Sequence, residues 1–205
     1  MSRHRFNFSA VIIFALGVLV VAACTTTSYL KVTYQRPDAN TGSTGKSVFL
    51  KITDSTGKTP FVGPKAADEL KQFSGLFSVY VAGDLPKPTL EGAYDISGLF
   101  EVAFRERLSA AGVTVIETAQ NGVPTLKVNL TAFQIDKDGR TWKARLGYMA
   151  SMHRSTTALT TQTVSGTAER AKIVGIGDAE KLLGEIVTDS VNKLDIETLF
   201  DHPEL

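Results

Sequence analysis

The sequence predicts an α+β domain in which two helices pack on one face of a mostly antiparallel sheet. Two segments repeat apolar residues at helical spacing, and the stretch between them alternates apolar and polar residues as half-buried strands do. The order along the chain is strand, long loop, helix, a series of strands and a last helix, without an internal repeat. This order favours a sheet of neighbouring strands with both helices on the same side.

Each predicted helix has a start signal and an apolar stripe. Asp95 or Ser97 is expected to cap the first helix, which runs to about Ala111 and ends at Gly112. Asp178 is expected to cap the second helix. Both stripes suit packing on a sheet. They consist of Ile96, Phe100, Ala103, Phe104, Leu108 and Ala111 in the first helix, and Leu183, Val187, Val191 and Leu194 in the second.

The strands are predicted from alternation and from turn residues. They fall at residues 48–52, 113–117, 126–132, 142–152 and 159–171, with a hairpin turn at residues 136–139. Residues 29–34 are also strand-like, and we expect them to join the sheet. Residues 60–94 contain four prolines around a strand-like segment at 76–81, so they are expected to form an irregular insertion.

The N-terminus has the order of a secretory signal. Arg3 and Arg5 precede an uncharged apolar stretch at residues 10–23, which ends at Cys24, the only cysteine. About 14 apolar residues are too few for a transmembrane helix, which needs about 20. An ordinary secretory signal needs no cysteine after the cut, and a metal site or thiol nucleophile would lack partner cysteines.

The run Val21-Ala22-Ala23-Cys24 resembles the lipobox of bacterial lipoproteins. The resemblance implies a signal peptide at residues 1–23 and a mature chain that starts at Cys24, with a diacylglycerol and an N-acyl chain on that residue. The polar residues 24–46 are then a lipidated tether, and residues 47–202 form a single domain.

The composition of the mature chain excludes some functions. Removal of residues 1–23 leaves 20 basic and 21 acidic side chains, a charge of about −1. Nucleic-acid binders carry basic patches and a high pI, so no nucleic-acid partner is expected. Without a second cysteine, the fold depends on its hydrophobic core and not on disulfides.

Motifs for catalysis, cofactors or metals are incomplete, and we expect no enzyme, cofactor or metal site. Residues 42–47 end like a phosphate-binding loop, but Asn40 stands where its first glycine belongs, and a strand follows instead of a helix. Ser155, Asp136 or Asp138 could in principle reach His153, but such combinations are common, and His153 lies in no nucleophile-elbow or metal-helix motif. Two aspartates at 136 and 138 resemble the start of a calcium loop whose twelfth position is a glycine.

One sheet face is a candidate partner surface. If the alternating apolar side chains that include Leu126 and Trp142 face the core, an apolar patch ringed by positive charge falls on the opposite face of the sheet. The alternative is that residues 60–94 cover this face, and a bulge would also change the assignment. The predicted surface consists of Phe133, Ile135 and Met149 with Lys143 and Arg145, next to Lys127.

Several segments together resemble the YajG-type lipoproteins of Gram-negative bacteria. They are the lipobox, Val48–Ile52 with Thr53-Asp54, Val62-Gly63, Leu108–Gly112 and Leu126–Leu130. The resemblance implies an outer-membrane lipoprotein and supplies no catalytic residues. A looser likeness links the order of elements to the auxiliary lipoproteins of ABC-type lipid transporters. In enterobacterial sorting, Thr25 after the cysteine favours the outer membrane.

The leading hypothesis is a lipid-anchored, periplasm-facing lipoprotein of the outer membrane that binds or scaffolds other envelope components without catalysis. The alternative is an auxiliary subunit of an ABC-type lipid or solute transport system. Both require a membrane contact and an envelope protein partner, and the sequence leaves open whether the chain forms a homo-oligomer.

Overall fold

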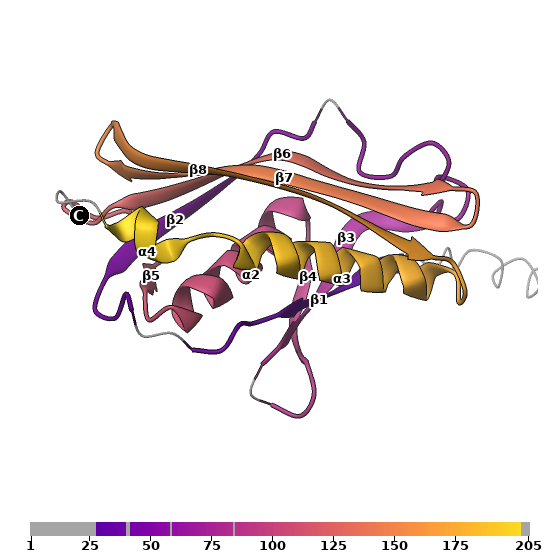
Figure 1. Cartoon of the computed structure of the whole chain (residues 1–205), viewed down its shortest axis with the longest axis horizontal. Helices are drawn as coiled ribbons and strands as arrows, with labels where there is room; N and C mark the ends of the chain where they lie inside the picture. Colours follow the sequence, from indigo (N-terminus) through magenta and orange to yellow (C-terminus); the bar gives the residue numbers. More distant parts are fainter. Residues whose placement is uncertain (1–27, 40–41, 58, 84, 202–205) are drawn as a thin grey trace, which may run out of the picture.

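The structure is a computed structural model, and it describes residues 28–39, 42–57, 59–83 and 85–201. This part of the chain forms two sheets and three helices (Figure 1). The α+β class is therefore confirmed. The expectation of one mostly antiparallel sheet holds only in part, because the smaller sheet contains one parallel pair and the larger sheet contains two.

The larger sheet has five strands in the order β5-β2-β6-β7-β8. β2 pairs in parallel with β5 and β6, whereas β6, β7 and β8 form an antiparallel meander. The long β6–β7 and β7–β8 hairpins make most of this sheet. The strands are β2 (Ser47–Asp54), β5 (Thr114–Ile116), β6 (Thr125–Asp138), β7 (Thr141–Arg154) and β8 (Thr157–Ala171).

The smaller sheet has three strands in the order β1-β3-β4, namely β1 (Ser28–Gln35), β3 (Phe73–Ala82) and β4 (Thr89–Tyr94). β1 pairs in parallel with β3, and β3 pairs antiparallel with β4. β1 lies in the segment that the sequence places in the tether, and its side chains Leu30, Val32 and Tyr34 are buried. The folded part of the chain therefore starts before residue 47.

The segment at 60–94 is more regular than expected, because β3 and β4 occupy much of it. Phe77 and Val79 of β3 are fully buried. Phe61 lies against Phe77 and Phe133, with ring centroids 5.1 and 5.0 Å apart. This segment therefore contributes to the core and is not a surface insertion.

The helices are α2 (Ile96–Ala110), α3 (Ile176–Asn192) and the short α4 (Ile196–Phe200). Asp95 caps α2 as predicted, because its carboxylate accepts a hydrogen bond from the Gly98 N–H at 2.8 Å. The predicted cap of α3 is wrong. That helix starts after Gly175, and Asp178 lies inside its first turn.

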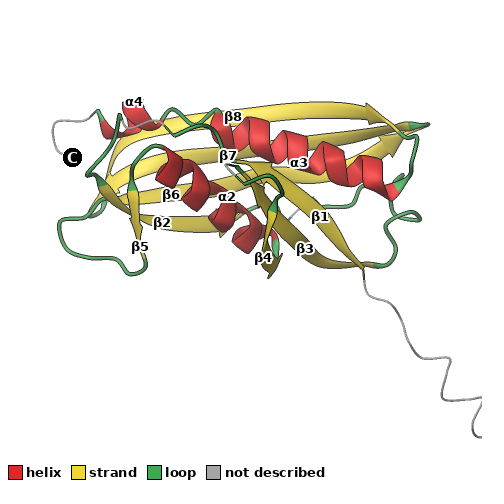
Figure 2. Ribbon diagram, turned by 90° about the horizontal axis from the view of Figure 1, so that it is seen from below, coloured by secondary structure: helices red, strands yellow, loops and turns green. Residues whose placement is uncertain are grey.

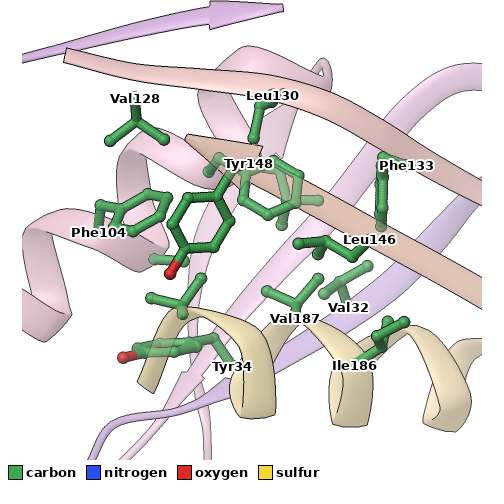
Figure 3. Close-up of a cluster of buried hydrophobic side chains, with 14 of the residues drawn as sticks. Val32, Tyr34, Phe104, Val128, Leu130, Phe133, Leu146, Tyr148, Ile186 and Val187 are labelled. Carbon is green, nitrogen blue, oxygen red and sulfur yellow. The ribbon is translucent and has the colours of Figure 1, made fainter. Parts of the chain in front are cut away.

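α2 and α3 lie on the same face of the five-stranded sheet, and β1, β3 and β4 lie beside them in the same layer (Figures 1 and 2). The core fills the space between the two layers (Figure 3). Tyr148 of β7 packs on Phe104 of α2, with ring centroids 5.1 Å apart, and its hydroxyl donates to the Ser190 carbonyl of α3 at 2.9 Å. The expected packing of both helices on one face is confirmed.

Candidate functional site

A groove runs between β1 and α3. The edge of β1 that does not pair with β3 faces this helix, and helix side chains bind its backbone. The Lys31 N–H donates to Glu180 Oε1, and the Gln35 N–H donates to Thr188 Oγ1, each at 2.9 Å. An edge strand covered in this way is protected against pairing with another chain.

Gly184 allows the close approach of α3 to β1. A Cβ atom at this position would lie 2.8 Å from the Thr33 carbonyl oxygen, which is closer than real Cβ contacts. A groove of about 440 Å³ lies along the two elements, and Lys31, Gln35, Glu180, Lys181, Thr188 and Asp189 are among the residues that line it.

The groove carries charges of both signs. Lys31 holds its ammonium 4.6 Å from the centroid of the Tyr80 ring, a cation–π contact that fixes the side chain. Glu185 pairs with Arg170 of β8. Ammonium and carboxylate groups stand along a lining that is largely apolar, so the groove can hold a peptide-like segment through charged and apolar contacts together. No local sequence pattern indicates this groove, because its residues come from segments about 150 positions apart.

β1 and α3 begin at the same end of the domain (Figure 1). Four exposed apolar residues belong to the starts of these two elements and to the turn before α3. We name this group the apolar tip. It consists of Tyr29, Ile173, Val174 and Ile176. It was not predicted from the sequence. The available signal was a pair of β-branched apolar residues directly before Gly175, in a turn where no periodicity requires them.

A buried carboxylate holds the turn of the apolar tip. Asp178 Oδ2 accepts hydrogen bonds from the N–H groups of Ile173 and Val174, at 2.7 and 2.5 Å. These backbone donors keep the pKa of Asp178 below its ordinary value. The Trp142 ring N–H donates to the Gly175 carbonyl at 3.2 Å, so the turn is fastened on two sides.

The predicted partner surface is only partly exposed. The assignment of Phe133 and Ile135 to this surface is wrong, because both side chains lie in the core, with exposed fractions of 1 and 0%. The physical reason is an irregularity in β6, where the pairing moves from Leu130↔Tyr148 to Ala132↔Gly147. One extra residue, Thr131, turns the following side chains to the other face.

Met149, Lys143 and Arg145 do lie on the face of the sheet away from the helices, and Met149 is 40% exposed. Lys143 Nζ lies 3.2 Å from Asp138 and 3.4 Å from Glu169, and hydrogen bonds to these two carboxylates raise its pKa. The positive charge on this face is thus partly neutralised. The apolar content is smaller than the sequence predicted.

The candidates for catalysis do not come together. His153 Nδ1 lies 3.5 Å from the ammonium nitrogen of Lys127, and its pKa is lowered by burial and by that cation. Asp136 and Asp138 lie at the opposite end of the β6–β7 hairpin, where Asp136 accepts hydrogen bonds from the backbone of residues 65 and 66. Among the described residues, His153 is therefore separated from both aspartates by the length of the hairpin.

Lys46, the lysine of the phosphate-loop-like segment, has a structural contact. Its ammonium donates to the Phe200 carbonyl at 2.8 Å and lies 5.2 Å from the centroid of the Phe200 ring. It therefore holds the end of α4. Within residues 28–201, apart from the few positions left undescribed, no three His, Cys, Asp or Glu side chains group as metal ligands.

Cys24, the predicted lipidation site, lies outside the described residues. In the part of the chain that the structure does describe, every helix is too short or too polar to cross a bilayer.

No family model and no curated protein matches the chain. Among solved structures, it is similar to a Xanthomonas campestris protein assigned to the family model DUF330, at 13% identity and a TM-score of 0.44, over 78% of this chain and 93% of that one. A minor lipoprotein from Acinetobacter baumannii is 14% identical with a TM-score of 0.41, over 72 and 87% of the two chains. Rare lipoprotein B from Shewanella oneidensis is 9% identical with a TM-score of 0.42, over 72 and 89%. These likenesses assign neither a family nor a function to the chain.

Proposed function

We propose that the protein is a lipoprotein anchored by Cys24 in the outer membrane, facing the periplasm, and that it binds another envelope component without catalysis. The observation that carries the binding role is the groove between β1 and α3. It is about 440 Å³ in volume and presents Lys31, Lys181 and Asp189 beside a covered strand edge. Such a site suits a polar or peptide-like segment of a partner protein.

The anchor is supported by the N-terminal sequence. A basic start, a short apolar stretch and Val21-Ala22-Ala23-Cys24 occur in the order that lipoprotein processing requires. One acyl chain holds a protein only marginally, whereas two or more hold it stably, so a diacylglycerol plus an N-acyl chain gives lasting attachment. Thr25 after the cysteine and the resemblance to YajG-type lipoproteins support the outer membrane.

Replacement of the cysteine tests the anchor. We expect Cys24→Ser to accumulate as an unprocessed precursor that incorporates no labelled palmitate, whereas the parent protein incorporates label and fractionates with the outer membrane. Equal labelling of the two proteins would refute the anchor. Labelling with fractionation in the inner membrane would refute only the outer-membrane assignment.

Site-specific photo-crosslinking in intact cells tests the groove. A photoreactive residue at Thr33, in the groove, is expected to give a crosslinked adduct, whereas one at Thr163, on the opposite face, gives none. The adduct should disappear when Asp189→Lys reverses a charge of the groove. Adduct formation at Thr163 alone would contradict the groove as the binding site.

The alternative function is an auxiliary subunit of an ABC-type transport system that contacts its partner through the open sheet face. The observation that favours it is the exposed Met149 on the sheet face away from the helices, with Arg145 on the same strand. For this function, Met149→Asp should reduce the recovery of a transporter subunit from crosslinked cells, and Asp189→Lys should leave that recovery unchanged. The reverse pattern would favour the groove.

A further inference from the structure

We propose that the apolar tip lies in the phospholipid leaflet that holds the anchor, with Ile173 and Val174 among the lipid head groups. The proposal rests on the lipid anchor proposed above, and it goes beyond it. The anchor alone would leave the orientation of the domain free, whereas an inserted tip fixes that orientation.

The side chains of the apolar tip are exposed. Ile173 and Val174 are 83 and 76% exposed, and Tyr29 and Ile176 are 48 and 44% exposed. Tyr29 and Ile176 line one hollow of about 390 Å³, so the strand start and the helix start form one surface. Apolar side chains with a tyrosine beside them match the boundary between lipid tails and head groups, where aromatic rings are enriched.

Hydrogen bonds fix the backbone of the turn that carries Ile173 and Val174. Asp178 and Trp142 hold its backbone with three hydrogen bonds, so Ile173 and Val174 cannot fold back onto the core. Asp178 itself is buried. The turn therefore presents these two apolar side chains to solvent in a fixed position, as insertion into lipid requires.

Few residues separate the proposed anchor from the first strand of the domain. β1 begins at Ser28, four residues after Cys24. Four residues span at most about 14 Å when fully extended. The start of β1, and the apolar tip with it, must therefore stay close to the membrane surface. No other exposed apolar side chain among the described residues is tied so closely to the anchor.

Two lysine side chains lie near the apolar tip. Lys71 lines the same hollow as Tyr29, and Lys181 lies five residues after Ile176 on α3. The two acidic residues of the hollow are already engaged, because Glu69 pairs with Lys137 and Lys172 and Glu180 accepts a hydrogen bond from the Lys31 N–H. Lys71 and Lys181 are both exposed. Their alkyl stems can lie along the apolar tip while the ammonium groups bind lipid phosphates. The surface therefore combines apolar insertion with cationic contacts, as membrane-binding surfaces do.

Fluorescence quenching in vesicles tests the proposal. The acylated full-length mature protein is reconstituted into vesicles of phosphatidylethanolamine and phosphatidylglycerol, with an environment-sensitive label at Ile173→Cys or Val174→Cys. The matched control carries the label at Leu85→Cys, which is also apolar and 66% exposed but lies in the β3–β4 connection. Acylation blocks the Cys24 sulfur, so only the introduced thiol reacts.

We expect a blue-shifted emission at 173 and 174, and at least twofold stronger quenching by spin-labelled lipids than at the control site. Equal emission and quenching at all three sites, in protein shown to be acylated by mass spectrometry, would overturn the proposal and leave the anchor intact. Protein that carries no acyl chains would refute the anchor itself. Parent-like thermal midpoints confirm that the labelled variants are folded.

Discussion

Gly184→Ala tests how closely α3 approaches β1. Alanine is the better helix former by about 1 kcal/mol, so propensity alone predicts a more stable protein. The new Cβ, however, would lie 2.8 Å from the Thr33 carbonyl oxygen and 3.4 Å from the Thr33 nitrogen. Both atoms belong to the backbone, and β1 is held by β3 on its other side. The strand and the helix must therefore separate.

Overpacking of this kind costs about 1–3 kcal/mol. The propensity gain offsets about 1 kcal/mol of that cost, so the free energy of unfolding should be unchanged or up to about 2 kcal/mol lower. Gly177→Ala is the matched control, because Gly177 lies in the same helix and an added Cβ meets nothing within 4 Å. We expect it to raise stability by up to about 1 kcal/mol.

The difference between the two variants isolates the contact, because propensity favours alanine in both. It should be about 1–3 kcal/mol, measured by urea unfolding of the purified mature proteins. For a chain of this size, about 2–4 °C in thermal midpoint corresponds to each kcal/mol. A Gly184→Ala protein as stable as Gly177→Ala would show that α3 and β1 are not in contact at Gly184. The groove described between these two elements would then not exist in that form.

Two further predictions concern the core and the apolar tip. Phe133→Ala should cost about 3–5 kcal/mol of unfolding free energy, whereas Met149→Ala should change it by less than about 0.5 kcal/mol, and equal effects in urea unfolding would contradict the bulge in β6. Asp178→Asn should lower the urea midpoint at pH 7, because a neutral amide is a weaker acceptor for the N–H groups of Ile173 and Val174. The pKa of Asp178 is lower in the folded state, so its stabilisation is present above the unfolded-state pKa of about 3.9 and is lost as pH falls through the folded-state value. Urea midpoints between pH 7 and pH 2 should therefore fall less steeply in Asp178→Asn than in the parent, and parallel curves would refute that role.

The sequence predicted β7 correctly, because its alternation is unbroken from Trp142 to Met152 and every apolar member of that set is buried. In β6 the same rule failed halfway. Thr131 adds one residue to the strand, and a Cβ on the opposing Gly147 would lie 3.1 Å from the Thr131 hydroxyl. A glycine inside an alternating strand is a signal for a bulge, so Gly147 could have revealed the change of face.

The smaller sheet was harder to predict. The alternation of Leu30, Val32 and Tyr34 indicates a strand, but β1 pairs in parallel with β3, which lies beyond β2 in the sequence. Parallel pairing needs a long crossover and leaves no local turn signal. The groove was hard to predict for the same reason, because its two elements are far apart in the sequence. Lys31 and Glu180 meet only because α3 returns along the free edge of β1, so no local pattern could identify the site.

The groove starts near the apolar tip, because Glu180 lines both the groove and the hollow beside Tyr29. Lys31 bonds to Glu180 and Gln35 bonds to Thr188, so β1 and α3 run in the same direction, away from the end where the apolar tip lies (Figure 2). Gln35 is six residues beyond Tyr29, which corresponds to about 20 Å along a strand. With the tip inserted, a ligand in the groove is held within about 20 Å of the lipid phosphates. Under the proposed insertion, a partner that binds in the groove must therefore approach to within that distance of the lipid surface.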